Sequence, residues 1–381
     1  MWVLFAAVSL GLIFLILLDA FEAIVLPRRV THGFRYTRLF YRSSWTLWRL
    51  VALRIKPGKR RETFLSTFGP LSLLLLLSTW ALWLILGFGL LQWSLGAALH
   101  SPDSTITFGT YVYMSGVTFF TLGLGDVTPL ESIGRTLAVV ESGIGFGFMA
   151  MIIGYLPVLY QAFSRREVTI SLLDARAGSP PSAAQILLRL AQAHNVAAVD
   201  PILAEWERWS AELLESHLSF PLLSFYRSQH DNQSWLAALT AILDTCALII
   251  AGVKDICPYQ AQLTFAMARH ASVDLALIFK TPPLVSEQDR LGSDRLAKLR
   301  RLLLDAGLHL RDEPEVDEKL IQLREMYEPF LNALANFFMF ALPPVFPDKT
   351  AVDNWQSSAW TKRTIGFGGL PVTHHRSEHF K

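Results

Sequence analysis

Two long stretches of the chain lack any basic residue, and this pattern limits the possible folds more than any other feature of the sequence. Lys and Arg are absent from residues 1–27 and 62–134, although the 381-residue chain contains 34 of them. Residues 63–102 contain no acidic residue either. Uncharged apolar runs of about 20 residues are typical of helices that cross a bilayer. With 52% hydrophobic and 17% charged residues, the sequence predicts a membrane part joined to a soluble part.

We expect three membrane-spanning helices, over residues 1–27, 68–91 and 131–163. Residues 28–61 carry eleven basic residues and no acid. Because cytoplasmic loops are enriched in Lys and Arg, the N-terminus is predicted outside and the segment 28–63 inside. The positive charge follows the first apolar run, which favours an uncleaved anchor over a signal peptide. Aromatic residues are interleaved with these charges, so 28–63 is predicted to lie at the membrane interface and to face anionic lipid, not nucleic acid.

Asp19 and Glu22 lie one helical turn apart near the cytoplasmic end of the first span. Acidic residues inside a membrane are candidates for a functional role. Their proximity to Arg28 and Arg29 favours pairing at the interface instead.

Residues 118–129 read Thr-Phe-Phe-Thr-Leu-Gly-Leu-Gly-Asp-Val-Thr-Pro and lie between the second and third spans. The preceding residues 106–120 are too few and too polar to cross a bilayer, and they predict a re-entrant helix. Its negative C-terminal end would point toward the membrane centre. Glycine at alternate positions, Gly123 and Gly125, permits a strand of alternating handedness whose carbonyl groups all face one axis. An ordinary glycine-rich turn is the alternative.

This stretch resembles the selectivity filter of potassium channels, whose usual core is Thr-Val-Gly-Tyr-Gly-Asp. It is similar to that of bacterial one-pore-loop channels and to the second pore loop of two-pore-domain channels, which carry Gly-Leu-Gly-Asp. The resemblance covers about residues 64–166 and implies that each chain supplies one filter strand to a homotetramer. It assigns the filter to Thr121, Leu122, Gly123, Leu124, Gly125 and Asp126.

Within this filter, the resemblance implies that the carbonyls of Thr121, Leu122, Gly123 and Leu124 bind permeant K⁺, and no other cofactor is expected. The side chains of Leu122 and Leu124 are expected to point backward into packing. Asp126 can tether the filter to its surroundings.

Further positions around the filter are candidates for supporting the pore, and among them Pro129, Gly134, Arg135 and Gly145 match the family pattern. The residues expected to support the pore or to act in gating are Thr118, Pro129, Gly134, Arg135, Glu141 and Gly145. Gly145 is either a gating hinge in the third span or a site of close helix packing. Glu141 either hydrogen-bonds behind the filter and tunes the cavity field, or is a satisfied core acid.

Two filter positions differ from the usual family residues. Leu124 stands where Tyr or Phe is usual, and Phe120 replaces a Thr. The potassium-selective channel therefore has two alternatives. One is a weakly selective cation channel, and the other is a non-conducting membrane receptor or scaffold that uses the pore module for assembly.

The C-terminal half differs in character from the membrane part. Gly178, Pro180 and Pro181 predict a linker over 167–182, followed by an all-helical cytoplasmic domain over 183–345 and a tail over 346–381. The apolar spacing within 315–341 fits a coiled-coil seam or, preferably, a buried core helix. Neither a nucleotide-binding fingerprint nor a metal-ligand spacing is present, so no enzyme activity is predicted and the domain's ligand or partner is unknown.

Together these observations predict an all-α membrane protein of the plasma membrane. Its pore module comprises residues 64–166, with a re-entrant helix and filter between the second and third spans.

Overall fold

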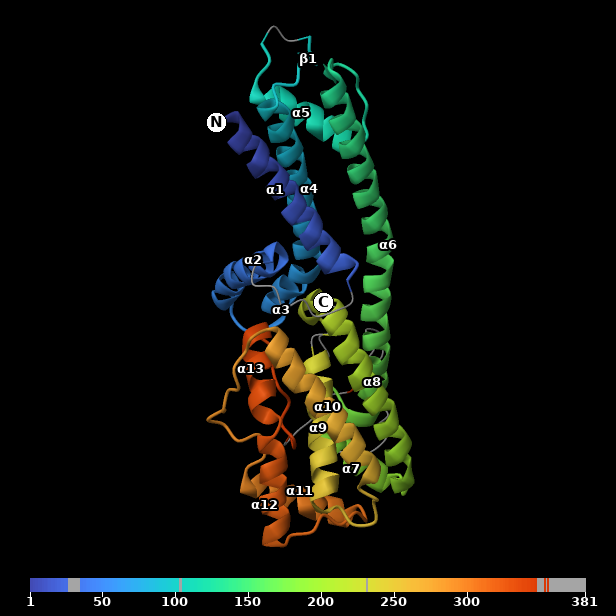
Figure 1. Cartoon of the computed structure of the whole chain (residues 1–381). Coiled ribbons are helices and arrows are strands. Elements are labelled where there is room, and N and C mark those ends of the chain that lie inside the picture. The colour runs from blue at the N-terminus through green and yellow to red at the C-terminus, as the bar shows by residue number, and fades with distance from the viewer. Residues whose placement is uncertain (27–34, 103–104, 231, 348–352, 354, 356–381) are drawn as a thin grey trace. The chain divides into compact units, whose positions relative to one another are not determined.

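The fold is mostly helical, as the sequence predicted (Figure 1). The computed structural model describes residues 1–26, 35–102, 105–230, 232–347, 353 and 355. Two compact units divide the chain, Met1–Gln161 and Ala162–Lys381. Within the described residues, the only strands form one short antiparallel pair, in which Leu99 is opposite Pro129. The predicted tail over 346–381 lies outside the described residues except for positions 346, 347, 353 and 355.

The first unit contains a small set of apolar helices joined by short connections. In chain order its elements are α1 (Trp2–Ile24), α2 (Tyr36–Leu53), α3 (Lys59–Ser66), α4 (Phe68–Ser94), β1 (Leu99–His100), α5 (Phe108–Phe119), β2 (Thr128–Pro129) and the first part of α6 (Ser132–Ala177). Both α1 and α5 pack against α4. Glycine permits these approaches, because a Cβ on Gly87 would lie 2.8 Å from Ile13 Cγ1 and one on Gly89 would lie 3.1 Å from Val112 Cα.

The two acids at the end of α1 have specific partners. The buried carboxylate of Asp19 accepts hydrogen bonds from Thr37 N at 3.0 Å and from Trp80 Nε1 at 3.0 Å. Glu22 forms an ion pair with Arg35 at 3.4 Å. Arg28 and Arg29, the partners expected from the sequence, lie outside the described residues. Asp19 therefore joins α1 to the start of α2 and to α4 through uncharged donors.

Helix α6 is longer than the sequence indicated. The segment 167–182 was predicted to be a linker, but α6 continues to Ala177. Ile170 and Leu173 of this extension are buried in the second unit, and this burial stabilises helix where the sequence suggested a loop. The helix ends at Gly178, whose φ of 80° suits a residue without a side chain.

The second unit is a bundle built around one completely buried helix. Its elements after α6 are α7 (Ala183–Gln192), η1 (Val196–Ala198), α8 (Val199–Ser219), η2 (Pro221–Phe225), α9 (Trp235–Gly252), α10 (Tyr259–Ile278), α11 (Ser293–Asp305), α12 (Pro314–Glu325) and α13 (Glu328–Phe338). Every residue of α9 is buried. Helices α7, α8, α10, α12 and α13 all contact it. The central helix therefore belongs to a packed core.

The segment 315–341, expected as one helix, is two helices in the structure. Helix α12 ends at Glu325 and α13 begins at Glu328, with Pro329 in the first turn of α13. Tyr327 and Leu334 are fully buried within the second unit. These side chains are not available to a partner helix, so the core interpretation describes them and a coiled-coil seam does not.

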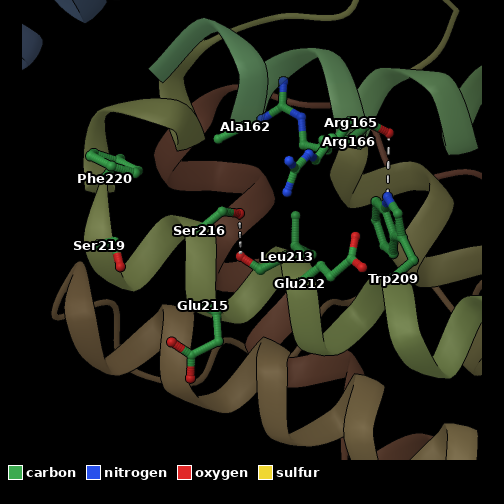
Figure 2. A pocket seen from close by; sticks show the side chains of 10 residues that line it. All are labelled: Ala162, Arg165, Arg166, Trp209, Glu212, Leu213, Glu215, Ser216, Ser219 and Phe220. Atoms are coloured by element: carbon green, nitrogen blue, oxygen red, sulfur yellow. Dashed lines mark hydrogen bonds between the residues drawn. The ribbon is translucent and has the colours of Figure 1, made fainter. Parts of the chain in front are cut away.

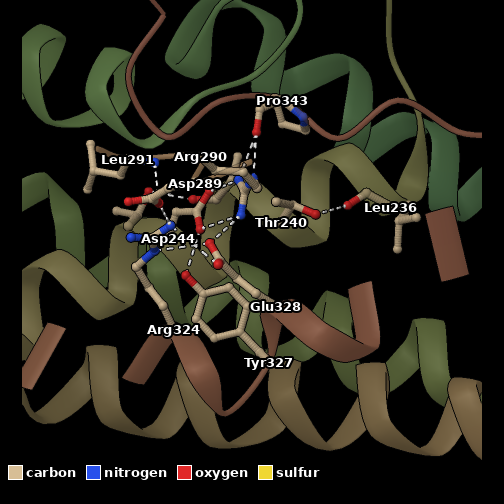
Figure 3. Close-up of polar contacts among 12 residues, drawn as sticks. Leu236, Thr240, Asp244, Asp289, Arg290, Leu291, Arg324, Tyr327, Glu328 and Pro343 are labelled. Carbon is tan, nitrogen blue, oxygen red and sulfur yellow. Dashed lines mark hydrogen bonds and ion pairs between the residues drawn. The ribbon is translucent and has the colours of Figure 1, made fainter. Parts of the chain in front are cut away.

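Polar residues hold α9 to the surrounding helices. Asp244 of α9 accepts a hydrogen bond from the Tyr327 hydroxyl at 2.6 Å and forms an ion pair with Arg290 (Figure 3). Arg290 also pairs with Glu328 at 3.0 Å, and Glu328 pairs with Arg324 at 3.0 Å. Each buried charge has an opposite charge beside it, as buried charges require.

Candidate functional site

Helix α5 leads directly into the candidate site. Its N-terminus has a capping box formed by Thr107 and Thr110. At its other end the Thr118 carbonyl accepts a hydrogen bond from Thr121 N at 3.0 Å, and Leu122 N donates to the Val117 carbonyl at 2.9 Å. These two bonds attach the start of the site to the last turn of the helix.

The backbone of the site alternates in handedness. Positive φ angles occur at Thr121 (55°), Gly123 (61°) and Gly125 (77°), and not at the two leucines between them. A Cβ on either glycine would meet no atom within 4 Å, so glycine is required here for its backbone conformation and not for space. The alternation extends to Thr121, where a side chain makes the conformation costly. Alternating handedness directs successive carbonyl groups toward one side of the strand.

Leu122 and Leu124 do not pack as expected within one chain. Their side chains are 62% and 63% exposed. The expected packing behind the strand is therefore absent from the described part of this chain.

A hydrogen bond ties the far end of the site to α5. The Tyr113 hydroxyl donates to Asp126 Oδ2 at 2.8 Å. Asp126 therefore has the tethering contact that the sequence suggested for it. The contact fixes the end of the alternating strand relative to α5, the helix that precedes this strand.

Pro129, Gly134 and Arg135 form the connection between the site and α6. Arg135 Nε donates to the Pro129 carbonyl at 3.2 Å. A Cβ on Gly134 would lie 3.0 Å from Pro129 Cβ, so this close approach favours glycine. Pro129 also belongs to the β1–β2 pair, which holds the connection in place.

Glu141 joins three helices behind the site. Its side chain is completely buried on α6 and is hydrogen-bonded to Ser115 Oγ of α5. Gln92 Nε2 of α4 lies 3.4 Å from Glu141 Oε2, and Ser115 Oγ lies 2.7 Å from the Ile85 carbonyl of α4. The carboxyl group therefore holds the middle of α5 against both flanking helices.

Gly145 lies where α6 passes the end of α5. A Cβ at this position would overlap the carbonyl oxygen of Phe119. Gly143 and Gly147, on the same helix, would meet nothing within 4 Å. Close packing explains the glycine at 145, and its role as a gating hinge stays a prediction.

Three partners in this site were not singled out from the sequence: Tyr113, Ser115 and Gln92. Gln92 had a usable signal, because it is an amide within an otherwise apolar helix. Tyr113 and Ser115 had none, since this short helix contains several other polar residues.

Residues 72–161 match the model of the ion channel family, and this range contains α5, the alternating strand and the start of α6. These residues form an ion channel domain. The recognition of a pore module in this range is thus confirmed.

Two bacterial proteins are similar to part of the chain. The uncharacterized membrane protein YdjJ of Bacillus subtilis (strain 168) is 25% identical over 194 residues, which cover 50% of this chain and 56% of that protein. Protein LctB of Bacillus caldotenax is 32% identical over 84 residues, which cover 19% of this chain and 62% of that protein. The chain thus spans less than two thirds of each relative. No solved structure gives a significant match.

The second unit has a separate feature at its start, an open pocket of about 320 Å³ beside α6 and α8 (Figure 2). Its lining residues are Ala162, Arg165, Arg166, Trp209, Glu212, Leu213, Glu215, Ser216, Ser219 and Phe220. Arg166 is buried and donates to the carbonyls of Leu223 at 2.8 Å and Tyr226 at 2.9 Å. The guanidinium thereby attaches α6 to the segment after α8.

His217 completes the contacts of Arg166. Its Nε2 lies 3.2 Å from Arg166 Nη1, and its Nδ1 lies 2.8 Å from the Leu213 carbonyl. Because a guanidinium can only donate, Nε2 must accept and Nδ1 must carry the proton, which makes the ring neutral. Burial, followed by the charge of Arg166, holds the pKa of His217 well below its ordinary value.

Proposed function

We propose that the chain is one subunit of a homotetrameric potassium-selective channel that conducts K⁺ passively across the plasma membrane. The observation that carries the proposal is the alternation of positive φ angles at Thr121, Gly123 and Gly125, directly after the C-terminal turn of α5. An ordinary glycine-rich turn has no reason to extend this strained conformation to a threonine.

In this proposal three helices cross the membrane: α1, α4 and α6. Helix α5 enters the membrane without crossing it, the N-terminus is outside, and the second unit is cytoplasmic. Helix α9 is also long and apolar enough to span a bilayer. Its complete burial inside the second unit supports assigning it to the soluble domain.

Conduction would use backbone groups. The carbonyls of Thr121, Leu122, Gly123 and Leu124 replace the hydration shell of K⁺, and repulsion between neighbouring ions speeds their exit. The C-terminal end of α5 carries the negative end of the helix dipole, which favours a cation beside it. The hydrogen bond at Asp126 would hold the strand in place relative to α5, and the hydrogen bond at Glu141 would hold α5 against α6.

Assembly follows from the number of filter strands. One chain supplies one strand, and enclosing an ion by carbonyls on all sides takes four. The exposed side chains of Leu122 and Leu124 support this arrangement, because neighbouring subunits would supply the packing that one chain lacks.

Gating would act through α6, which is shared by the two units. We expect the cytoplasmic bundle to bend or displace this helix through the contacts of Arg166 with the segment after α8. Unchanged open probability after removal of residues 183–345 would contradict this step.

One feature favours a second candidate, a weakly selective cation channel. Leu124 offers no phenol hydroxyl with which the filter could be fastened to its surroundings. The tether from Tyr113 to Asp126 is then the principal polar restraint at that end of the strand. A non-conducting receptor or scaffold is the third candidate.

Potassium efflux from liposomes tests conduction. The purified full chain should release K⁺ down its gradient, and Ba²⁺ should block the release. Gly123→Asp should abolish efflux, since the backbone conformation there disfavours a side chain. Gly292→Asp is the matched control, because Gly292 lies at a helix N-cap where an added Cβ would meet no atom within 4 Å, and it should leave efflux intact. Efflux that survives both Ba²⁺ and Gly123→Asp would reject the filter as its path.

A further inference from the structure

Helix α2 has an apolar face that no part of the described chain covers. Leu39, Leu47, Leu50 and Val51 are all about half exposed or more, at 52%, 66%, 54% and 47%. Their spacing places them along one side of the helix. The opposite side carries Trp45 and Ala52, which are buried. The helix is therefore apolar on two sides, and only one of these sides is packed.

A row of arginines borders the uncovered face. Arg38, Arg42 and Arg49 follow at intervals of four and seven residues, so they lie along one line of the helix. Arg38 and Arg42 are exposed, and neither makes an ion pair within the described residues. No acidic residue occurs anywhere in residues 28–61 to neutralise them.

The orientation of α2 is fixed by contacts within the first unit. At its start, Thr37 is hydrogen-bonded to the buried Asp19 of α1, and the Tyr36 hydroxyl accepts from Trp83 Nε1 at 3.3 Å. Further along, Trp48 stacks on Phe64 with 4.4 Å between the ring centroids. These contacts prevent the helix from turning its leucines inward.

Helices α1 and α4, which hold α2 in place, are themselves long and apolar enough to cross a membrane. A helix fastened along them lies next to lipid. Aliphatic side chains then enter the acyl region while arginine side chains extend to the headgroups, where phosphate accepts their hydrogen bonds.

We propose that the Leu39, Leu47, Leu50 and Val51 face of α2 is embedded in the bilayer and that Arg38 and Arg42 bind the phosphate groups of anionic phospholipids in the adjoining leaflet. This inference rests on the part of the proposed function that places α1 and α4 in the membrane. It does not depend on conduction, and its test measures no ion flux.

Spin-label accessibility tests the embedding. The full chain with Cys257→Ser is labelled at Leu47→Cys and, as a control on the exposed connection after α2, at Lys56→Cys, in nanodiscs of phosphatidylcholine and phosphatidylglycerol. We expect the label at 47 to be accessible to oxygen and protected from a water-soluble nickel chelate, and the label at 56 to show the reverse. Nickel access at 47 equal to that at 56 would overturn the proposal. Protection from both reagents at 47 would also overturn it and would indicate a second copy of the chain on this face.

Lipid-specific quenching tests the headgroup contact. A bimane at position 47 should be quenched about twofold more by doxyl-labelled phosphatidylglycerol than by doxyl-labelled phosphatidylcholine at equal mole fraction, because each basic residue enriches anionic lipid nearby. Arg38→Gln combined with Arg42→Gln should bring this ratio to about one. The pair Lys254→Gln and Lys319→Gln, which removes the same charge from the second unit, should leave it unchanged. A ratio unaffected by the arginine pair would contradict the headgroup contact.

Discussion

Helices α6 and α9 are similarly apolar, and each is long enough to cross a membrane, but they differ strongly in burial. In their most apolar stretches 17% of the residues of α6 are buried, against 100% in α9. Val139, Phe146 and Ile153 of α6 are each about 70% exposed. In α9 even Asp244 and Thr240 are buried, and each has a hydrogen-bond partner.

The difference shows that apolarity alone does not say what a helix contacts. Helix α9 finds all its neighbours within its own unit, so its sequence serves the folding of that unit. Helix α6 leaves much of its apolar surface exposed within the chain, and it approaches α5 closely at Gly145 and Glu141. Mutations in α9 should therefore affect stability, and mutations at the contacts of α6 should affect conduction.

The largest effect is expected in α9. Asp244→Ala removes the partner of Arg290 and Tyr327 and leaves a buried guanidinium short of negative charge. We expect a loss of about 3–5 kcal/mol in the free energy of unfolding, measured by thermal unfolding of the full chain in detergent. Thr136→Ala on the exposed side of α6 should change it by less than about 0.5 kcal/mol. Equal losses of unfolding free energy in Asp244→Ala and Thr136→Ala would contradict the claim that α9 serves the folding of its unit more than α6 does.

The next effect concerns Gly145, where α6 meets α5. Gly145→Ala places a methyl group against the Phe119 carbonyl and should displace the end of α5 at a cost of about 1–3 kcal/mol. If this cost falls on the conducting state, potassium efflux should fall by about 5- to 150-fold, since each 1.4 kcal/mol is a factor of about ten in rate. Gly147→Ala, which meets nothing within 4 Å, is the matched control and should conduct normally. Equal efflux through Gly145→Ala and Gly147→Ala would show that the close approach of α6 to α5 is not needed for conduction.

A similar or smaller effect is expected at Glu141. Glu141→Leu would leave Ser115 and Gln92 without their shared partner at a cost of about 1–3 kcal/mol. Glu141→Gln keeps a polar group in place and should retain most of the efflux. If both variants conduct like the original chain, the buried carboxyl does not support the pore.

The smallest effect is a pH dependence in the second unit. The neutral His217 has a folded-state pKa well below 6.5, so the unfolded chain binds an additional proton at acid pH. Its contribution to stability is complete above pH 6.5 and decreases as the pH falls toward the folded-state pKa, by up to about 1.4 kcal/mol per pH unit. His217→Gln should flatten the change in unfolding temperature between about pH 7.5 and 5.5. His270→Gln, at an exposed position, is the control and should leave this change as it is in the original chain. Identical pH profiles for the original chain and both variants would contradict the assignment of the pH dependence to His217.

The sequence predicted those parts of the site in which the backbone conformation favours one type of residue. Gly123 and Gly125 indicated a strand of alternating handedness because glycine is favoured at positive φ. The partners of Glu141 could not be predicted, since Ser115 and Gln92 lie 26 and 49 residues away and meet it only through the packing of three helices. Thr121 was assigned to the filter, but its positive φ could not be predicted, because this angle depends on bonds to the preceding turn of α5.

The fold shows the same limit. Charge and hydropathy indicated where apolar helices occur, since each signal is local. The continuation of α6 to Ala177 was missed because Ile170 and Leu173 are stabilised by burial among distant residues. Likewise hydropathy did not separate α9 from a membrane helix, and only its burial by the surrounding helices does so.

The central claim is that carbonyls of the strand from Thr121 to Leu124 select K⁺. It is tested most directly by the reversal potential of the full chain in a planar bilayer, with K⁺ on one side and Na⁺ at equal concentration on the other. A potassium-selective filter predicts a shift of about 59 mV for each tenfold preference for K⁺. A conducting channel whose current reverses near zero would contradict potassium selectivity.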